Sequence, residues 1–320
     1  MVARDIARAA EALRAGDLVA FPTETVYGLG ADASNAGAVK KLFAVKRRPV
    51  DHPVIVHIAR TEQLEELAVD VPGTARALAD AFWPGPLTLV VKRNGERVVP
   101  EVTGGRDTVG LRVPDHPVAR ALLAAFGGGV AAPSANRFGK VSPTTAAHVR
   151  ADLGDDVAVV LDGGPSSIGI ESTIVDVTGS EPAILRIGGV TRAQIEATLG
   201  RRCEVRTTGE VAAPGTLASH YSPNAAVEIV DAVAVADRAR EHADADRRVG
   251  VLAPSSALGD LPDGLVVLDP PHDTADYARV LYARLRAADE LDLDVLLVVL
   301  PPETDGLGAA IADRVRRAGR

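Results

Sequence analysis

The feature that most constrains this chain is a series of short apolar runs, most of them rich in valine, isoleucine or leucine and each followed by polar residues. In the first part of the chain the runs are LVAF (18–21), VIVHI (54–58), LTLVV (87–91), VGLRV (109–113), GGVAA (128–132), VAVVL (157–161), STIVDV (172–177) and AILRI (183–187). Their composition and their flanking glycines and prolines are typical of β-strands. Helical patterns at 36–47, 71–83 and 116–127 lie between several of them. This half therefore predicts an α/β domain with helices on a twisted mixed sheet.

A second, simpler alternation occupies the end of the chain. Apolar runs at 227–233, 248–254, 265–269 and 294–301 alternate with helical patterns, most clearly at 276–291 and 306–319. Near-continuous apolar strands separated by helices indicate a smaller, Rossmann-like parallel sheet with both faces covered. The predicted domains are therefore residues 1–205 and 228–320.

The segment 206–227 between the two domains is predicted to be an ordered linker. It is poor in large apolar residues and contains Pro214, Gly215 and Pro223. A flexible tether would not need His220 and Tyr221, so we expect this segment to adopt a defined structure.

Composition excludes several classes of protein. The 320 residues are 47% hydrophobic and 24% charged, which is typical of a globular protein, and the net charge of −8 disfavours a surface built for nucleic acid. The single cysteine, Cys203, excludes an intramolecular disulfide and a cysteine-rich zinc site. The first residues form an amphipathic helical pattern rather than a signal peptide, and no apolar run approaches the ~20 residues that span a membrane. A cytoplasmic protein is expected.

Familiar catalytic and nucleotide-binding motifs are absent from the sequence. There is no phosphate-binding G-x-x-x-x-G-K-[ST] loop, no G-x-S-x-G elbow and no H-E-x-x-H pair, and Gly28-Leu-Gly30 lacks the third glycine of a dinucleotide fingerprint. The C-terminal domain lacks a glycine-rich first turn, which favours a structural or regulatory role for it.

Polar clusters instead follow the predicted strands, where ligands bind in open α/β sheets. Thr23, Glu24 and Thr25 follow the first run, and any one of these threonines could simply cap a turn. Lys46 and Arg48 end a helix, where they could either stabilise the helix dipole or clamp a phosphate.

Further polar residues repeat this pattern along the chain. Arg112 is embedded in an apolar run, where burying an unpaired charge is costly, so it is expected to meet an anion. Arg186 is a further cation in apolar surroundings. Hydroxyl and amide side chains accompany them at Thr108, Ser134, Asn136 and Ser172. Together these residues predict one polyanion site lined by polar groups.

The motifs PTETVYGLG, KRRP followed by HPVIVHI, WPGPLTLVV, GLRVP, APSAN, ESTIVD and ILRIG resemble the YrdC/Sua5 family of threonylcarbamoyl-AMP synthases over residues 5–205. The linker APGTLASHYSP and the tail TDGLGAAIADRVRRAGR resemble the longer, two-domain Sua5-type members.

The resemblance implies a nucleotidyltransferase that joins L-threonine, bicarbonate and ATP. Threonine and bicarbonate would form a carbamate that attacks the α-phosphorus of ATP, with Mg²⁺ accompanying the triphosphate as cofactor and no resident metal. Pyrophosphate would leave, and a partner threonylcarbamoyl transferase would pass the group to adenosine 37 of tRNA, giving t6A.

The resemblance also assigns residues to the two substrates. Lys46 and Arg48 would be catalytic. The nucleotide-binding residues would be Lys46, Arg48, His52, Thr108, Ser134, Asn136, Arg186 and Tyr221, and the threonine-binding residues would be Thr23 or Thr25, His57, Arg112 and Ser172. His52 departs from the family, because many members have Asn there.

A second hypothesis is a non-catalytic module that binds double-stranded RNA or tRNA through a basic concavity. Weak RNA binding fits a cationic site, whereas the acidic net charge disfavours it. A hydrogenase-maturation carbamoyltransferase is disfavoured because such proteins carry zinc-finger cysteines.

Overall fold

The computed structural model describes residues 2–206, 221–258, 261–262, 264–304 and 306–319. These residues divide into two compact units. The first contains residues 2–138, 142–167 and 171–206, and the second contains 139–141, 168–170 and the described residues from 221 onward.

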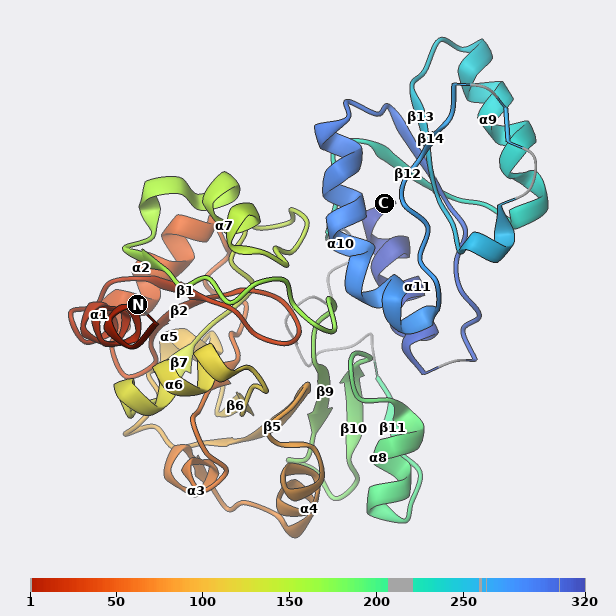
Figure 1. The fold of residues 1–320 in the computed structure, drawn as a ribbon. Coiled ribbons are helices and arrows are strands. Elements are labelled where there is room, and N and C mark those ends of the chain that lie inside the picture. Colours follow the sequence, from red (N-terminus) through yellow and green to blue (C-terminus); the bar gives the residue numbers. More distant parts are fainter. Residues whose placement is uncertain (1, 207–220, 259–260, 263, 305, 320) are drawn as a thin grey trace. The chain divides into compact units, whose positions relative to one another are not determined.

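The first unit is a mixed α/β structure (Figure 1). Its helices are α1 (Val2–Arg14), α2 (Ala36–Lys46), α3 (Gln63–Leu67), α4 (Gly73–Phe82), α5 (Pro100–Thr103), α6 (Pro117–Phe126), α7 (Ala146–Leu153) and α8 (Arg192–Leu199). Its strands are β1 (Val19–Phe21), β2 (Gly28–Asp32), β3 (Val56–His57), β4 (Ala68–Val69), β5 (Leu87–Arg93), β6 (Thr108–Arg112), β7 (Val130–Ala131), β8 (Val159–Val160), β9 (Thr173–Asp176), β10 (Ala183–Arg186) and β11 (Glu204–Val205).

These strands form one 11-stranded mixed sheet, as the sequence predicted. The order is β11-β10-β9-β5-β6-β3-β7-β2-β1-β8, with β4 beside β5. Each apolar run predicted as a strand in this half contains one. The parallel pair β3–β6 lies at the centre and places His57 directly opposite Arg112.

Strand β2 was not predicted from the sequence, which placed its glycine-rich segment in a polar cluster. It pairs antiparallel with β1 and with β7. A Cβ on Gly30 would lie 2.8 Å from a methyl carbon of Val130, so the strand needs a residue without a side chain there. The Gly28-Leu-Gly30 sequence is therefore part of the sheet rather than a nucleotide-binding turn.

Apolar side chains cover both faces of this sheet. On one face Ala9 and Leu13 of α1 and Leu122 of α6 pack with Val19 and Phe21 of β1. The other face forms a larger core with helices α2, α4 and α8. Because successive strand residues point to opposite faces, β1 contributes to both layers, with Ala20 in the larger core and Val19 and Phe21 in the other. Full burial of each leucine or valine stabilises the fold by roughly 1.5–3 kcal/mol.

Cys203 lies between α8 and β11, near the end of the first unit, and is buried in the larger core. Burial, followed by the nearby Glu196 carboxylate, raises the pKa of its thiol. The thiol therefore stays protonated and packs as a small apolar side chain.

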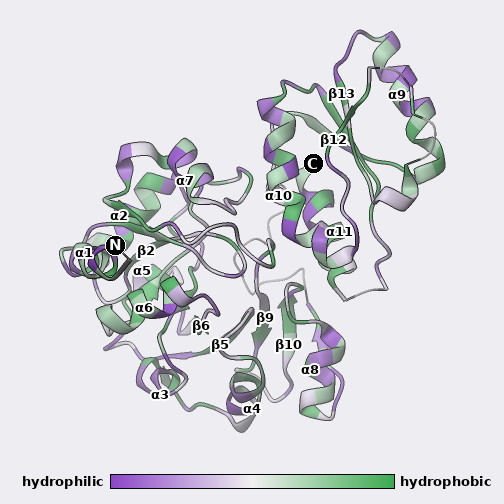
Figure 2. Ribbon diagram, in the orientation of Figure 1, coloured by the Kyte–Doolittle hydropathy of each residue, from purple (hydrophilic) through white to green (hydrophobic). Residues whose placement is uncertain are grey.

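The second unit contains a parallel sheet of four strands in the order β12-β15-β13-β14. Its elements are β12 (Ala226–Ile229), α9 (Val235–Asp244), β13 (Val249–Leu252), β14 (Val266–Val267), α10 (Thr274–Glu290), β15 (Val295–Val298) and α11 (Leu307–Ala318). Strands β13 and β15 are fully buried, which confirms the reading of near-continuous apolar runs as a covered parallel sheet. Helices α9 and α10 carry both polar and apolar residues (Figure 2).

Two short segments that the sequence placed in the first domain belong to the second unit. In 139–141, the Gly139 carbonyl accepts a hydrogen bond from the Ser222 amide (3.0 Å), and Lys140 Nζ donates to Asn224 Oδ1 (2.9 Å). In 168–170, a Cβ on Gly169 would lie 2.5 Å from the Arg279 backbone. Contacts of this kind are made by loops and leave no periodic pattern in the sequence. The linker prediction falls mostly on 207–220, outside the described residues.

Among the described residues, no helix is both long enough and apolar enough to cross a lipid bilayer.

Candidate active site

The loop after β1 is a buried turn that the Thr23 side chain holds in place. Thr23 Oγ1 accepts hydrogen bonds from the backbone N–H groups of Thr25 (3.3 Å) and Val26 (3.2 Å) and lies 2.6 Å from the Val26 carbonyl. The Thr25 hydroxyl lies 2.8 Å from it. Thr23 therefore fixes the turn, as the simpler interpretation expected. Thr25 instead contacts Arg112 on strand β6.

Arg112 lies at the centre of the contacts made by this loop, and its side chain is only 4% exposed. Its Nη1 donates to Thr25 Oγ1 (2.9 Å) and its Nε donates to the carbonyl of Gly85 (3.1 Å). Its Nη2 lies 2.6 Å from Oε1 of Glu24, forming a buried ion pair. The expectation that a buried Arg112 meets an anion is thus confirmed, and that anion is a carboxylate of the chain itself.

His57 lies on the neighbouring strand at the same level as Arg112. Burial, followed by the charge of Arg112, lowers the pKa of His57 well below its ordinary value. The imidazole is therefore neutral at physiological pH, so it can exchange a hydrogen bond without adding charge. We call Thr23, Glu24, Thr25, His57 and Arg112 the Arg112 cluster.

Ser172 and Arg186 form a second cluster with Thr88 of β5. The Ser172 hydroxyl lies 2.8 Å from the Thr88 hydroxyl, and Arg186 donates to both the Ser172 hydroxyl and the Ser172 carbonyl, at 3.0 Å each. We call these three residues the Ser172 cluster. Sequence reasoning missed Thr88, although the signal was the one used for Arg112: a polar residue inside an apolar run.

Strand register places these two clusters on one face of the sheet. Leu89 pairs with Leu111 in the antiparallel β5–β6 ladder, so Thr88 and Arg112 continue the ladder on the same side. Thr88 pairs with Ile174, which pairs with Arg186. Arg186, Thr88, Arg112 and His57 therefore line neighbouring strands of one surface.

Lys46 belongs to a third cluster, formed where α2 ends. Its Nζ is buried and donates to the backbone carbonyls of Ser134 and Asn136. Burial and, after it, the charge of Arg48 lower the pKa of Lys46 well below its usual range. The loop 132–138 is thereby tied to the end of α2, so the segment KRRP and the segment APSAN act as one structure.

Arg48 and His52 lie in the adjoining loop. Arg48 Nη2 donates to the Pro53 carbonyl (2.9 Å), and its guanidinium lies 5.6 Å from the centre of the Phe138 ring. The His52 ring meets the same phenylalanine edge-on, at 5.6 Å. Burial, with a contribution from Arg48, lowers the pKa of His52. We call Lys46, Arg48, His52, Ser134 and Asn136 the Lys46 cluster.

The turn after β1 joins the Lys46 cluster to the Arg112 cluster. Gly28 forms a β-bridge with Ser134, and the Ala135 amide donates to the Tyr27 carbonyl (2.8 Å). The segment 23–28 therefore touches both groups. Most of the residues that the sequence assigned to the two substrates belong to one connected part of the first unit.

Thr108 has no hydrogen bond to these clusters among the described residues, and Tyr221 belongs to the second unit. Thr108 begins β6, four residues from Arg112, which is about 13 Å along a strand. Tyr221 lies in the second unit, where its buried ring stacks on Tyr282 (5.4 Å) with Arg314 above it (5.9 Å). Their proposed contacts with the nucleotide stay predictions.

Within the part of the chain that the structure describes, no group of three or more His, Cys, Asp or Glu side chains could hold a metal ion. The donors near the candidate site are mainly cations and hydroxyls, which suit phosphate oxygens. This chemistry fits a Mg²⁺ ion held chiefly by a triphosphate rather than by a protein cage.

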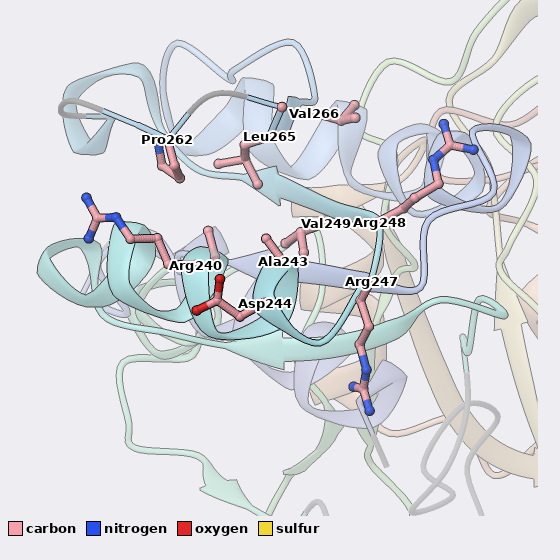
Figure 3. A pocket seen from close by; sticks show the side chains of 11 residues that line it. Arg240, Ala243, Asp244, Arg247, Arg248, Val249, Pro262, Leu265 and Val266 are labelled. Carbon is pink, nitrogen blue, oxygen red and sulfur yellow. The ribbon is translucent and has the colours of Figure 1, made fainter.

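A separate cavity of about 510 Å³ lies in the second unit between α9 and strands β13 and β14 (Figure 3). Charged and apolar residues both line it, and the side chains of Arg240, Arg247 and Arg248 extend away from one another rather than into it. It also lies at the start of β13, at Val249, whereas ligands of parallel sheets bind at the carboxyl ends of strands. The candidate active site is therefore in the first unit.

A mixed sheet that buries cations and hydroxyls beside a hydrogen-bonded loop defines an α/β protein with a candidate site for an anionic ligand. Residues 11–188 match a family model described as "Telomere recombination" (Sua5, YciO and YrdC), and residues 190–319 match "Threonylcarbamoyl-AMP synthase, C-terminal domain". The chain belongs to the Sua5/YrdC family of threonylcarbamoyl-AMP synthases.

Individual relatives are similar over nearly the whole chain. A threonylcarbamoyl-AMP synthase of Bacillus subtilis is 42% identical, covering 98% of this chain and 92% of the relative. One from Pyrococcus abyssi is 41% identical, covering 97% and 92%. A crystal structure of P. abyssi Sua5 complexed with L-threonine matches with a TM-score of 0.91 and 40% identity, covering 98% of this chain and 94% of that one.

Proposed function

We propose that this protein is an L-threonylcarbamoyladenylate synthase that converts L-threonine, bicarbonate and ATP into L-threonylcarbamoyl-AMP and pyrophosphate. The observation that carries the proposal is that one loop, residues 23–28, connects two clusters whose side chains suit different substrates. The Lys46 cluster offers charge suited to phosphates, and the Arg112 cluster offers a cation and hydroxyls suited to an amino acid. Membership of the family supports the same activity.

The proposed reaction has two steps, and its atoms balance. The neutral amine of threonine attacks the carbon derived from bicarbonate, which releases water and leaves an N-carboxylate. An oxygen of that carboxylate then attacks the α-phosphorus of ATP, and pyrophosphate leaves. When bound with the triphosphate, Mg²⁺ would neutralise part of its negative charge.

The chain's own groups bind and orient the reactants. A bound triphosphate would favour the charged form of Lys46, which has one proton left after its two backbone acceptors and can donate it to a phosphate oxygen. Arg48 presents a planar fork that suits phosphate oxygens, and such contacts stabilise negative charge that develops during transfer. Burial of both residues also limits the access of water, which would hydrolyse the mixed anhydride.

The product is expected to pass to a partner threonylcarbamoyl transferase that modifies adenosine 37 of tRNA in the cytoplasm. A mixed carbamic–phosphoric anhydride is an activated acyl donor, and the class of reaction that consumes it is transfer to an amine. The exocyclic amine of adenosine is such an acceptor.

Pyrophosphate release tests the proposed function directly. Purified protein is mixed with ATP, Mg²⁺ and bicarbonate, and each of the twenty amino acids is added in turn. We expect strong release with L-threonine and little with the others, including serine. Release without any amino acid, or equal release with many, would contradict the proposal.

Two further measurements sharpen this test. Lys46→Met should abolish release, whereas Lys92→Met, at an exposed lysine paired with Asp70, should leave it unchanged. Binding of tRNA that falls steeply with salt and does not respond to ATP or threonine would support the RNA-binding alternative instead.

A further inference from the structure

Glu24 is the buried carboxylate closest to Arg112, and it has unused hydrogen-bonding capacity. Its side chain is 4% exposed, and Arg112 Nη2 approaches Oε1 to 2.6 Å without hydrogen-bond alignment. Among the described residues, no group donates a hydrogen bond to either oxygen of Glu24, and Nη2 of Arg112 likewise has no acceptor. Two carboxylate oxygens that can accept hydrogen bonds and one guanidinium nitrogen that can donate them therefore lie next to each other, without partners among the described residues.

This arrangement is costly unless a ligand completes it. An ionised carboxylate can accept about four hydrogen bonds, and leaving a buried polar group unmet costs about 1–3 kcal/mol. The Thr23 hydroxyl donates its proton to the Val26 carbonyl, so the Thr25 hydroxyl donates its own proton to Thr23 Oγ1, and neither donates to Glu24.

The charges select the chemical class of that ligand. Glu24 and Arg112 cancel each other, so a lone phosphate would meet the carboxylate and a lone amine would meet the guanidinium, both unfavourably. A zwitterion, with an ammonium and a carboxylate on one carbon, matches both groups at once. An α-amino acid is such a molecule.

We propose that Glu24 binds the α-amino group of the amino-acid substrate, beside Arg112, which binds its carboxylate. The inference rests on the proposed function and adds a residue to it. After carboxylation the carbamate N–H still donates to Glu24. Glu24 repels the new N-carboxylate and so directs it away from the Glu24–Arg112 ion pair. The N-carboxylate is then free to attack the α-phosphorus of ATP.

The test compares two ligands in two proteins by isothermal titration calorimetry without bicarbonate. The ligands are L-threonine and (2S,3R)-2,3-dihydroxybutanoate, which has a hydroxyl in place of the amine. Glu24→Gln keeps the size of the side chain but removes its charge. We expect its affinity for L-threonine to fall by about 10- to 100-fold, the range for a charged hydrogen bond, while its affinity for the dihydroxy acid changes little.

A matched control uses another buried carboxylate of the same unit. Glu171 accepts a hydrogen bond from the Ser142 hydroxyl (2.9 Å), so Glu171→Gln removes a buried charge from a residue with a different partner. Its ratio of affinities for the two ligands should equal that of the unmodified protein. If Glu24→Gln does not fold, Glu24→Asp keeps the charge on a shorter side chain and should reduce the ratio by a smaller factor.

The outcomes separate this inference from the proposed function. If the unmodified protein neither binds L-threonine nor releases pyrophosphate with it, the proposed function is wrong. If it does both, but Glu24→Gln, or Glu24→Asp in its place, weakens the two ligands equally or leaves both unchanged, Glu24 merely positions Arg112 and the inference is overturned.

Discussion

The two units of this molecule use charged side chains in opposite ways. In the first unit Lys46, Arg112 and Arg186 are buried beside the sheet and hydrogen-bonded to hydroxyls or carbonyls. In the second unit strands β13 and β15 carry only apolar residues and glycine, and most of the ion pairs lie on exposed helix surfaces. The buried Arg314 is the exception there, and it packs against an aromatic ring.

This difference shows which residues of an α/β protein indicate a functional site. A polar residue in a strand costs free energy unless it is paired, and Glu228 in β12 of the second unit is paired with Arg238. Polar residues inside strands are therefore more informative than polar residues in loops. Four predictions probe the comparison, beginning with the largest effect.

Arg48→Ala should reduce threonine-dependent pyrophosphate release by at least about 100-fold, because it removes a fork that suits phosphate oxygens. Its neighbour Arg47 is exposed at the end of α2, so Arg47→Ala is the matched control and should retain most activity. Both variants should have unchanged circular dichroism spectra. Full activity in Arg48→Ala would show that the Lys46 cluster does not hold the triphosphate.

Tyr221→Ala should destabilise the second unit by about 3–5 kcal/mol, since it removes a buried ring that stacks on Tyr282. Calorimetry should show a lower unfolding temperature, whereas Val233→Ala, at a side chain 92% exposed, should leave it unchanged. Unaltered pyrophosphate release by a folded Tyr221→Ala would also refute the predicted role of Tyr221 at the nucleotide.

Stability should fall in acid because His57, His52 and His116 each have a pKa below the ordinary value, mainly through burial. Below about pH 6.5 the unfolded chain binds protons that the folded chain does not. The free energy of unfolding then falls by up to about 1.4 kcal/mol per pH unit for each histidine. Urea unfolding between pH 7.5 and 5 should show this slope, and His57→Gln should reduce it. If the free energy of unfolding of His57→Gln falls with pH as steeply as that of the unmodified protein, His57 has the same pKa in the folded and unfolded chain.

The smallest effects are expected from exposed ion pairs, and they should be similar in the two units. Arg76→Ala, which breaks the pair with Glu65, and Arg240→Ala, which breaks the pair with Asp237, should each cost less than about 1 kcal/mol. Urea unfolding in 0.05 M and 0.5 M NaCl should show the cost shrinking as salt rises. A large loss from either variant would break the distinction between buried and exposed charge.

Sequence alone predicted the two kinds of sheet because strand periodicity and composition are local properties. Runs such as LTLVV and DVLLVVLP became β5 and β15, and Arg112 met an anion as its apolar surroundings required. Strand β2 was missed because its glycines lack the side chains on which a strand pattern depends.

The partners of the site residues were harder to predict, since they are set by long-range register. Nothing local indicates that Ser172 meets Thr88, or that Lys46 binds the carbonyls of Ser134 and Asn136. Every residue has a backbone carbonyl, so a sequence motif cannot indicate which carbonyl accepts the hydrogen bond. The sequence likewise gives no local indication that Glu24 pairs with Arg112.

The burial of Cys203 provides a chemical reporter of motion at the end of the first unit. A protonated, enclosed sulfur reacts slowly with disulfide reagents, so modification requires transient opening around α8 and β11. Because the chain has one cysteine, the labelling rate reads a single location without mutagenesis. Slower labelling in the presence of substrates would reveal that ligand binding reduces the opening of the region around α8 and β11.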